Sequence, residues 1–78
     1  MRTITDTNGT KWQVGYIYTH EPIEGVETRS ARAAQIAPGY GQINLSPVGQ
    51  GGNRSGHSFP EWMIAEALNG RIRLGINK

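Results

Sequence analysis

The chain has 78 residues, no cysteine and a formal net charge of +2 at pH 7. Without thiols it has no disulfides, no thiolate zinc site and no cysteine nucleophile, so packing or association must stabilise it. No apolar run approaches the roughly 18 residues of a membrane span, and no signal peptide is visible, which predicts a cytoplasmic protein without membrane contact. The length predicts one small domain over residues 1–78.

The first twenty residues predict a β-hairpin, because residues 6–9 form an Asp-Thr-Asn-Gly turn between two β-rich runs. In the second run, every other residue is large and apolar or aromatic, as in a half-buried strand. The side chains expected on the core face are Trp12, Val14, Tyr16 and Tyr18. Ile17 is the one exception to this alternation.

The segment after the hairpin is harder to assign. Residues 20–27 contain a proline, a glycine and three glutamates, which predicts a solvated acidic loop. Residues 28–37 favour a short helix, because they are rich in alanine and end before a Pro-Gly pair. The competing interpretation is a strand, in which Arg32, Ala34 and Ile36 share one side and the polar Gln35 faces the other. The Pro-Gly pair that follows would then turn the chain into the next strand.

The middle of the chain predicts a strand and then a loop. Residues 42–46 alternate between polar and apolar side chains, which predicts a short strand with Ile43 and Leu45 inward. Residues 49–57 contain four glycines and predict a flexible loop. The alternative for this loop is an anion site formed by converging backbone amides and Arg54. Because the Gly-Lys-Ser/Thr ending of a phosphate-binding loop is absent, we do not predict a nucleotide site.

A helix is predicted over about residues 59–69. Ser58 and Glu61 have the spacing of a capping box, in which each side chain bonds a backbone amide near the other residue. Gly70 is suited to the left-handed conformation that follows many helix ends. Trp62 projects away from the apolar face of this helix, beside polar positions.

Alternation over residues 71–76 predicts a C-terminal strand, with Leu74 inward and Arg71 and Arg73 outward. The predicted fold class is α+β. The N-terminal hairpin, the short middle strand and the C-terminal strand would form a small antiparallel or mixed sheet, with the capped helix across one face. The alternative is an SH3-like small β-barrel with one helix, if residues 28–37 form a strand.

No complete catalytic or metal motif accompanies these elements. A catalytic site would have to be assembled from His20, His57 and Ser55, without a visible third group to orient the base. A metal site would lack a fourth ligand. We therefore expect no enzyme activity, no catalytic residue, no metal and no cofactor.

The favoured function is a non-enzymatic binding module that acts through protein–protein contact, as a regulator, an inhibitor or an assembly subunit would. A tryptophan outside the core face is typical of interface hot spots. The expected contact residues are Trp62, Tyr40, Arg54, Arg71 and Arg73. Association into homo-oligomers is a further expectation for so small a chain.

The alternative function is nucleic-acid binding, since residues 28–78 hold six basic and two acidic side chains. The expected contacts are Arg29, Arg32, Arg54, Arg71 and Arg73. This alternative is the weaker one, because the sequence shows neither a recognition-helix pattern nor paired aromatic residues on a basic strand.

Overall fold

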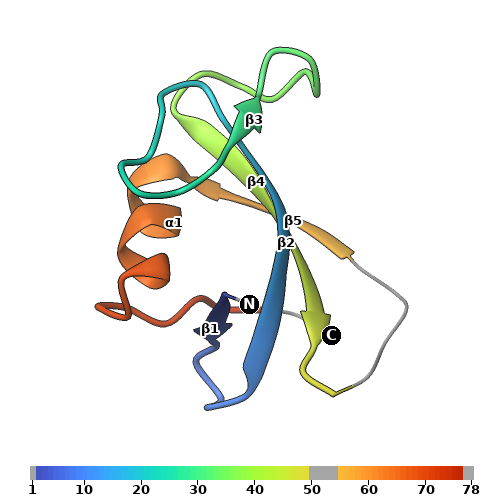
Figure 1. Ribbon diagram of the computed structural model, residues 1–78, viewed down its shortest axis with the longest axis vertical. Helices are drawn as coiled ribbons and strands as arrows, with labels where there is room; N and C mark the ends of the chain where they lie inside the picture. The colour runs from blue at the N-terminus through green and yellow to red at the C-terminus, as the bar shows by residue number, and fades with distance from the viewer. Residues whose placement is uncertain (1, 50–54, 77–78) are drawn as a thin grey trace.

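The computed structural model describes residues 2–49 and 55–76. Within these residues the chain forms β1 (Thr3–Thr5), β2 (Lys11–Thr19), β3 (Arg29–Ser30), β4 (Tyr40–Pro47), β5 (Ser55–Pro60) and α1 (Glu61–Leu68). The five strands make one sheet in the order β1-β2-β4-β5, with β3 on the other end of β2, and α1 covers one face (Figure 1). No helix among the described residues is long and apolar enough to cross a membrane.

The predicted α+β class is confirmed. The β2–β3 pair is parallel and the other strand pairs are antiparallel, so the sheet is mixed. The described strands do not close into a barrel, and the SH3-like alternative is therefore not adopted.

The predicted hairpin is present, and a buried carboxylate holds it together. Asp6 is fully buried, and its Oδ1 accepts hydrogen bonds from the amides of Asn8 and Thr10 at 2.9 and 2.8 Å. Its Oδ2 accepts one from the Trp12 indole Nε1 at 2.8 Å. Hydrogen bonds to a charged acceptor are stronger than neutral ones, so this carboxylate fixes both the turn and the indole.

A β-bulge in β2 changes which side chains face the core. Val14 pairs with Leu45 and Ile17 with Ile43, so three steps along β2 match two steps along β4. One extra residue moves all later side chains to the opposite face. Ile17 is accordingly 4% exposed and Tyr16 is 50% exposed.

The predicted core face of β2 is therefore half right. Trp12 is buried and Val14 packs against the core, as expected. The inward placement of Tyr16 and Tyr18 is wrong, because the bulge turns them away from α1 and brings Ile17 inward.

The helix favoured over residues 28–37 is also wrong. Arg29–Ser30 form the short strand β3, and a series of turns follows it. The Ala31 amide donates to the Thr19 carbonyl at 3.1 Å, and the Ile36 amide donates to the Ala31 carbonyl at 3.1 Å. The backbone groups of this segment are thus hydrogen-bonded to β2 and within a tight turn. These hydrogen bonds outweigh the small preference of alanine for a helix.

The strand β4 contains the predicted strand 42–46, and both Ile43 and Leu45 are fully buried as expected. The prediction of a loop over residues 55–57 is wrong, because these residues belong to β5, which pairs with β4. Residues 50–54, the rest of that predicted loop, lie outside the described residues.

The predicted capping box does not form, because Ser58 is paired with Gln42 inside the sheet. Pro60 stands at the start of α1 without a side-chain cap. The Glu61 carboxylate instead accepts a hydrogen bond from the backbone amide of His20. This contact joins the start of the helix to the end of β2.

The predicted end of the helix is confirmed. Gly70 has a left-handed φ of +74°, its amide donates to Ala67 at 3.1 Å, and the Arg71 amide donates to Glu66 at 2.9 Å. This pair of bonds is the Schellman arrangement.

The predicted C-terminal strand is reduced to a single parallel bridge between Leu74 and Asp6. The Thr7 amide donates to the Leu74 carbonyl at 3.0 Å, and the Leu74 amide donates to Thr5 at 3.3 Å. Leu74 and Ile76 are buried, so the inward alternation is right although the described residues form no strand here. Residues 71–76 pair with the sheet at Asp6 alone, at the start of the hairpin turn, which gives a bridge and no strand.

Gly41 sits where α1 packs on the sheet. A Cβ at this position would lie 2.7 Å from the Tyr18 carbonyl oxygen and 3.0 Å from Ile64 Cδ1. The backbone oxygen cannot move aside without disturbing the β2–β4 pairing. The close packing of helix and sheet therefore requires glycine.

We predict that Gly41→Ala lowers the free energy of unfolding by about 1–3 kcal/mol, through overpacking. Gly75→Ala is the matched control: a Cβ at Gly75 meets nothing within 4 Å, so a change below about 0.5 kcal/mol is expected. Urea denaturation followed by circular dichroism measures both. Equal changes in the two variants would contradict the packing described here.

Candidate binding surfaces

Trp62 is the most exposed large apolar side chain among the described residues, with 64% of its surface open to solvent. It lies on α1, whose buried residues are Ile64 and Ala67. The prediction that Trp62 lies off the core face is confirmed. An exposed tryptophan contributes little to the fold, which leaves its large apolar area available for contact.

A hollow of about 360 Å³ separates α1 from the acidic loop. Its lining residues, here called the Trp62 surface, are Glu21, Pro22, Ile23, Glu24, Glu61, Trp62, Ala65 and Asn69. Four of them are apolar and three are glutamates, and neither lysine nor arginine lines the hollow. The lining of the Trp62 surface is therefore half apolar and carries negative charge.

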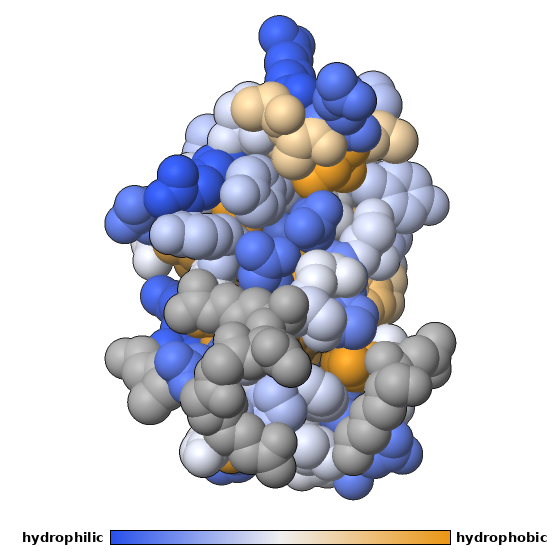
Figure 2. All heavy atoms as spheres, turned by 90° about the vertical axis from the view of Figure 1, so that its right-hand side faces the viewer, coloured by the Kyte–Doolittle hydropathy of each residue, from blue (hydrophilic) through white to orange (hydrophobic). Residues whose placement is uncertain are grey.

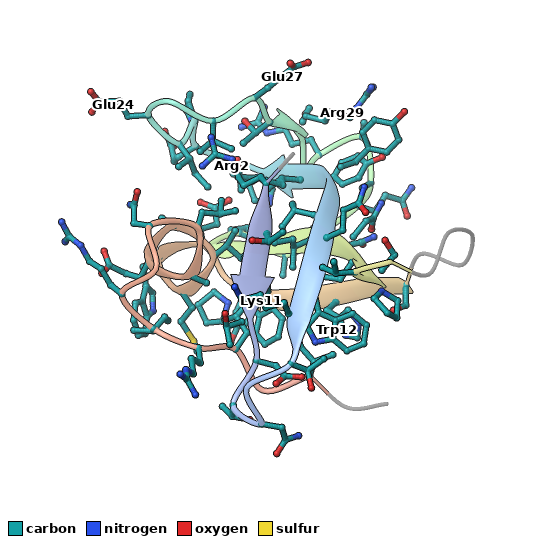
Figure 3. All side chains as sticks on the ribbon, turned by 60° about the horizontal axis from the view of Figure 1, so that its bottom comes forward. Arg2, Lys11, Trp12, Glu24, Glu27 and Arg29 are labelled. Carbon is teal, nitrogen blue, oxygen red and sulfur yellow. The ribbon has the colours of Figure 1, made fainter. Side chains whose placement is uncertain are left out.

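The acidic loop is held at several points. Arg2 Nη2 donates to the Gly25 carbonyl at 3.3 Å, and Figure 3 shows Arg2 beneath the loop that carries Glu24 and Glu27. Thr19 Oγ1 donates to the Glu21 carbonyl at 2.8 Å. These bonds attach the loop to β2 and to the start of the chain, so the hollow is largely formed in advance.

The other residues expected to contact a protein are placed apart from Trp62. Tyr40 is 47% exposed on β4, opposite Pro60, and does not line the Trp62 surface. Arg71 Nη1 lies 3.8 Å from Glu66 Oε2, and Arg73 lines a different hollow beside β1. Arg54 lies outside the described residues. The immediate charged neighbours of Trp62 are thus glutamates.

The sheet face opposite α1, here called the open face, is mostly hydrophilic (Figure 2). Cross-strand pairing places one residue from each of four strands in a row. The row runs Arg29, Tyr18, Gln42, Ser58. Arg29 Cζ also lies 4.1 Å from the centre of the Tyr16 ring, a cation–π contact.

The arginines expected to bind nucleic acid fall into two groups. Arg29 and Arg32 both line a hollow next to β3, which Glu21 also lines. The strand β3 is at the top of Figure 1. Arg71 and Arg73 lie in the segment after α1, at the lower left of that view. Sequence reasoning missed that Tyr16 and Tyr18 lie beside Arg29. The signal in the sequence for the bulge that brings them there is Ile17, which breaks the alternation of β2.

The two histidines make separate contacts. His20 Nε2 donates to the carbonyls of Ile36 and Ala37 at 2.7 and 3.1 Å. His57 Nε2 lies 3.0 Å from Ser55 Oγ in an exposed position. Catalysis by a serine–histidine pair needs a third group that orients the ring, and the described residues show none bonded to His57. No group of three or more potential metal ligands occurs among the described residues.

Comparison with known proteins provides no family for this chain. No protein-family model matches it, and neither a curated protein nor a solved structure does. The function is therefore argued from the two surfaces described above.

The two tryptophans are predicted to differ sharply in their contribution to stability. Trp12→Ala should lower the free energy of unfolding by about 3–5 kcal/mol, because a buried, hydrogen-bonded side chain is removed. Trp62→Ala should change it by less than about 1 kcal/mol. Chemical denaturation monitored by circular dichroism compares them. A large loss of stability in Trp62→Ala would show that Trp62 is a structural residue.

Proposed function

We propose that this protein is a non-enzymatic binding module that acts through protein–protein contact, with Trp62 as its anchor. The observation that supports this proposal is the 64% exposure of Trp62 beside a preformed apolar hollow. Tryptophan is enriched among the few interface residues that supply most of the binding energy. A module of this kind acts by occupying a surface of its partner, as a regulator, an inhibitor or an assembly subunit does.

The partner segment is expected to be cationic. Glu21, Glu24 and Glu61 line the Trp62 surface together with its four apolar residues. A segment with an apolar side chain flanked by lysine or arginine matches both features, since complementary charge speeds association and excludes acidic competitors. Arg71, beside Glu66 in the segment after α1, lies outside the Trp62 surface and offers a separate contact for a carboxylate.

We place this module in the cytoplasm, because the sequence contains no apolar segment of membrane-span length and no cysteine. Homo-oligomers stay a prediction from the small size of the chain.

The proposal is tested by a pull-down from nuclease-treated lysate with three baits: the wild type, Trp62→Ala and Tyr16→Ala. Tyr16→Ala is the matched control, because it removes another exposed aromatic ring from a different face. A protein partner should be retained by the wild type and by Tyr16→Ala, and should bind Trp62→Ala at least about 30-fold more weakly.

Charge is tested in the same assay. Glu24→Gln, which removes one carboxylate from the Trp62 surface, should weaken binding and reduce its dependence on salt. Retention of the same proteins by Trp62→Ala as by the wild type would contradict the proposal, as would the absence of any retained protein.

A further inference from the structure

The open face carries all three tyrosines of the chain. Tyr16 and Tyr40 are 50% and 47% exposed, and Tyr18, which pairs with Arg29 of β3, is partly exposed. Exposed tyrosines offer flat rings on which planar groups can stack. The bulge in β2 is what brings Tyr16 and Tyr18 to this face.

The spacing of two rings suits consecutive planar groups. Tyr18 is directly opposite Gln42, and Tyr40 lies two residues from Gln42 along β4. Diagonal neighbours of this kind are about 7–8 Å apart in antiparallel sheets. Two adjacent rings on one sheet face are the arrangement on which successive unpaired bases stack.

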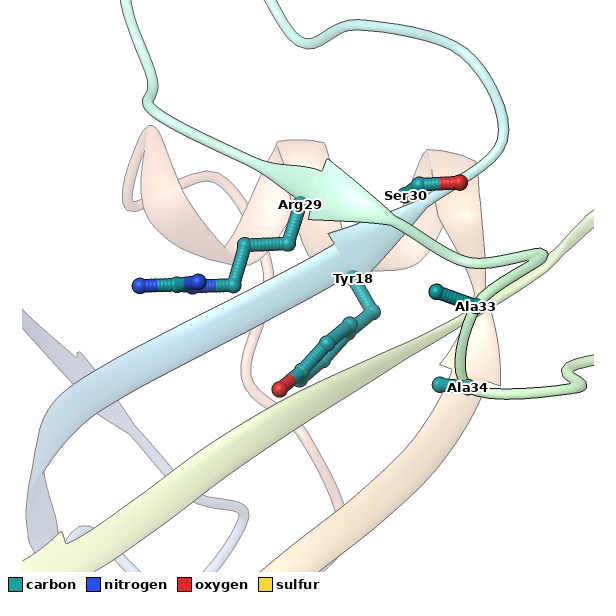
Figure 4. Close-up of a pocket in the computed structure, with 5 residues that line it drawn as sticks. All are labelled: Tyr18, Arg29, Ser30, Ala33 and Ala34. Atoms are coloured by element: carbon teal, nitrogen blue, oxygen red, sulfur yellow. The ribbon is translucent and has the colours of Figure 1, made fainter.

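A hollow of about 560 Å³ lies beside Tyr18, and Figure 4 shows its lining. The lining residues are Tyr18, Arg29, Ser30, Ala33 and Ala34. The alanine methyl groups are small and leave space next to the ring, within the range of about 300–1,000 Å³ that is typical of ligand pockets. Arg29 is the one charged residue of this lining, so the hollow is positively charged.

Hydrogen-bonding groups continue the row away from Arg29. Gln42 Nε2 donates to Asn44 Oδ1 at 3.1 Å, and Gly56 is paired with Asn44. A Cβ at Gly56 would lie 2.5 Å from Gln42 Nε2, so glycine gives the amide its space. Side-chain amides can both donate to and accept from the edges of bases.

We infer that the open face binds single-stranded nucleic acid. Bases stack on Tyr18 and Tyr40, Arg29 contacts the phosphates, and Gln42 contacts base edges. The cationic hollow beside an aromatic ring selects this anionic, planar ligand over a neutral sugar. This inference goes beyond the proposed protein contact and involves different residues on the other side of the sheet from α1.

The test is fluorescence anisotropy of a labelled oligothymidylate, about 12 nucleotides long, titrated with the full chain at about 20 mM salt. We expect binding that weakens log-linearly as salt rises, and weaker binding of a duplex of the same length. Arg29→Gln should lower the affinity about tenfold. Arg71→Gln, which removes the same charge from an exposed arginine elsewhere, should change it less than about twofold.

Two tyrosine variants test stacking independently of charge. Tyr18→Leu should lower the affinity about tenfold. Tyr40→Leu, which removes the other stacking ring at a 47% exposed position, should do the same and keeps the test decisive if Tyr18→Leu does not fold. Trp62→Ala should bind the oligonucleotide as the wild type does, so that this inference and the proposed protein contact can fail separately. The inference is overturned by absence of binding at low salt, by equal losses in Arg29→Gln and Arg71→Gln, or by equal binding of duplex.

Discussion

The register shift between Val14 and Ile17 is the constraint on which both faces of the sheet depend. Because β2 carries one extra residue there, Ile17 joins the core and the neighbouring tyrosines face away from α1. β2 is also the strand that pairs with β1, β3 and β4, so its register determines which residues of those strands lie opposite each of its own residues. The row from Arg29 to Ser58 on the open face follows directly from that pairing.

The sheet and its helix separate two surfaces of opposite character. The lining of the Trp62 surface holds three glutamates and no basic residue, whereas the lining of the hollow beside Tyr18 holds an arginine and no carboxylate. The small net charge of +2 conceals this separation. Since the two surfaces share no lining residue, the proposed protein contact and the proposed nucleic-acid contact do not compete for the same side chains.

Local signals in the sequence predicted the features that local chemistry determines. The Asp-Thr-Asn-Gly turn, the left-handed Gly70 and the exposure of Trp62 belong to this group. The features that depend on distant pairing were missed. Strict alternation placed Tyr16 and Tyr18 inward, since the break in the pattern at Ile17 does not by itself show that the pairing with β4 shifts there. Ser58 and Glu61 matched a capping box, but pairing with β4 keeps Ser58 extended.

The register of β2 against β4 can be measured through nuclear Overhauser effects between the two strands. Cross-strand contacts are expected from Ile17 to Ile43 and from Tyr18 to Gln42. Without the bulge, the pairing of Val14 with Leu45 would continue so that Tyr16 lay opposite Ile43. Contacts between Tyr16 and Ile43 in place of those from Ile17 would contradict the account, because the tyrosines would then belong to the core.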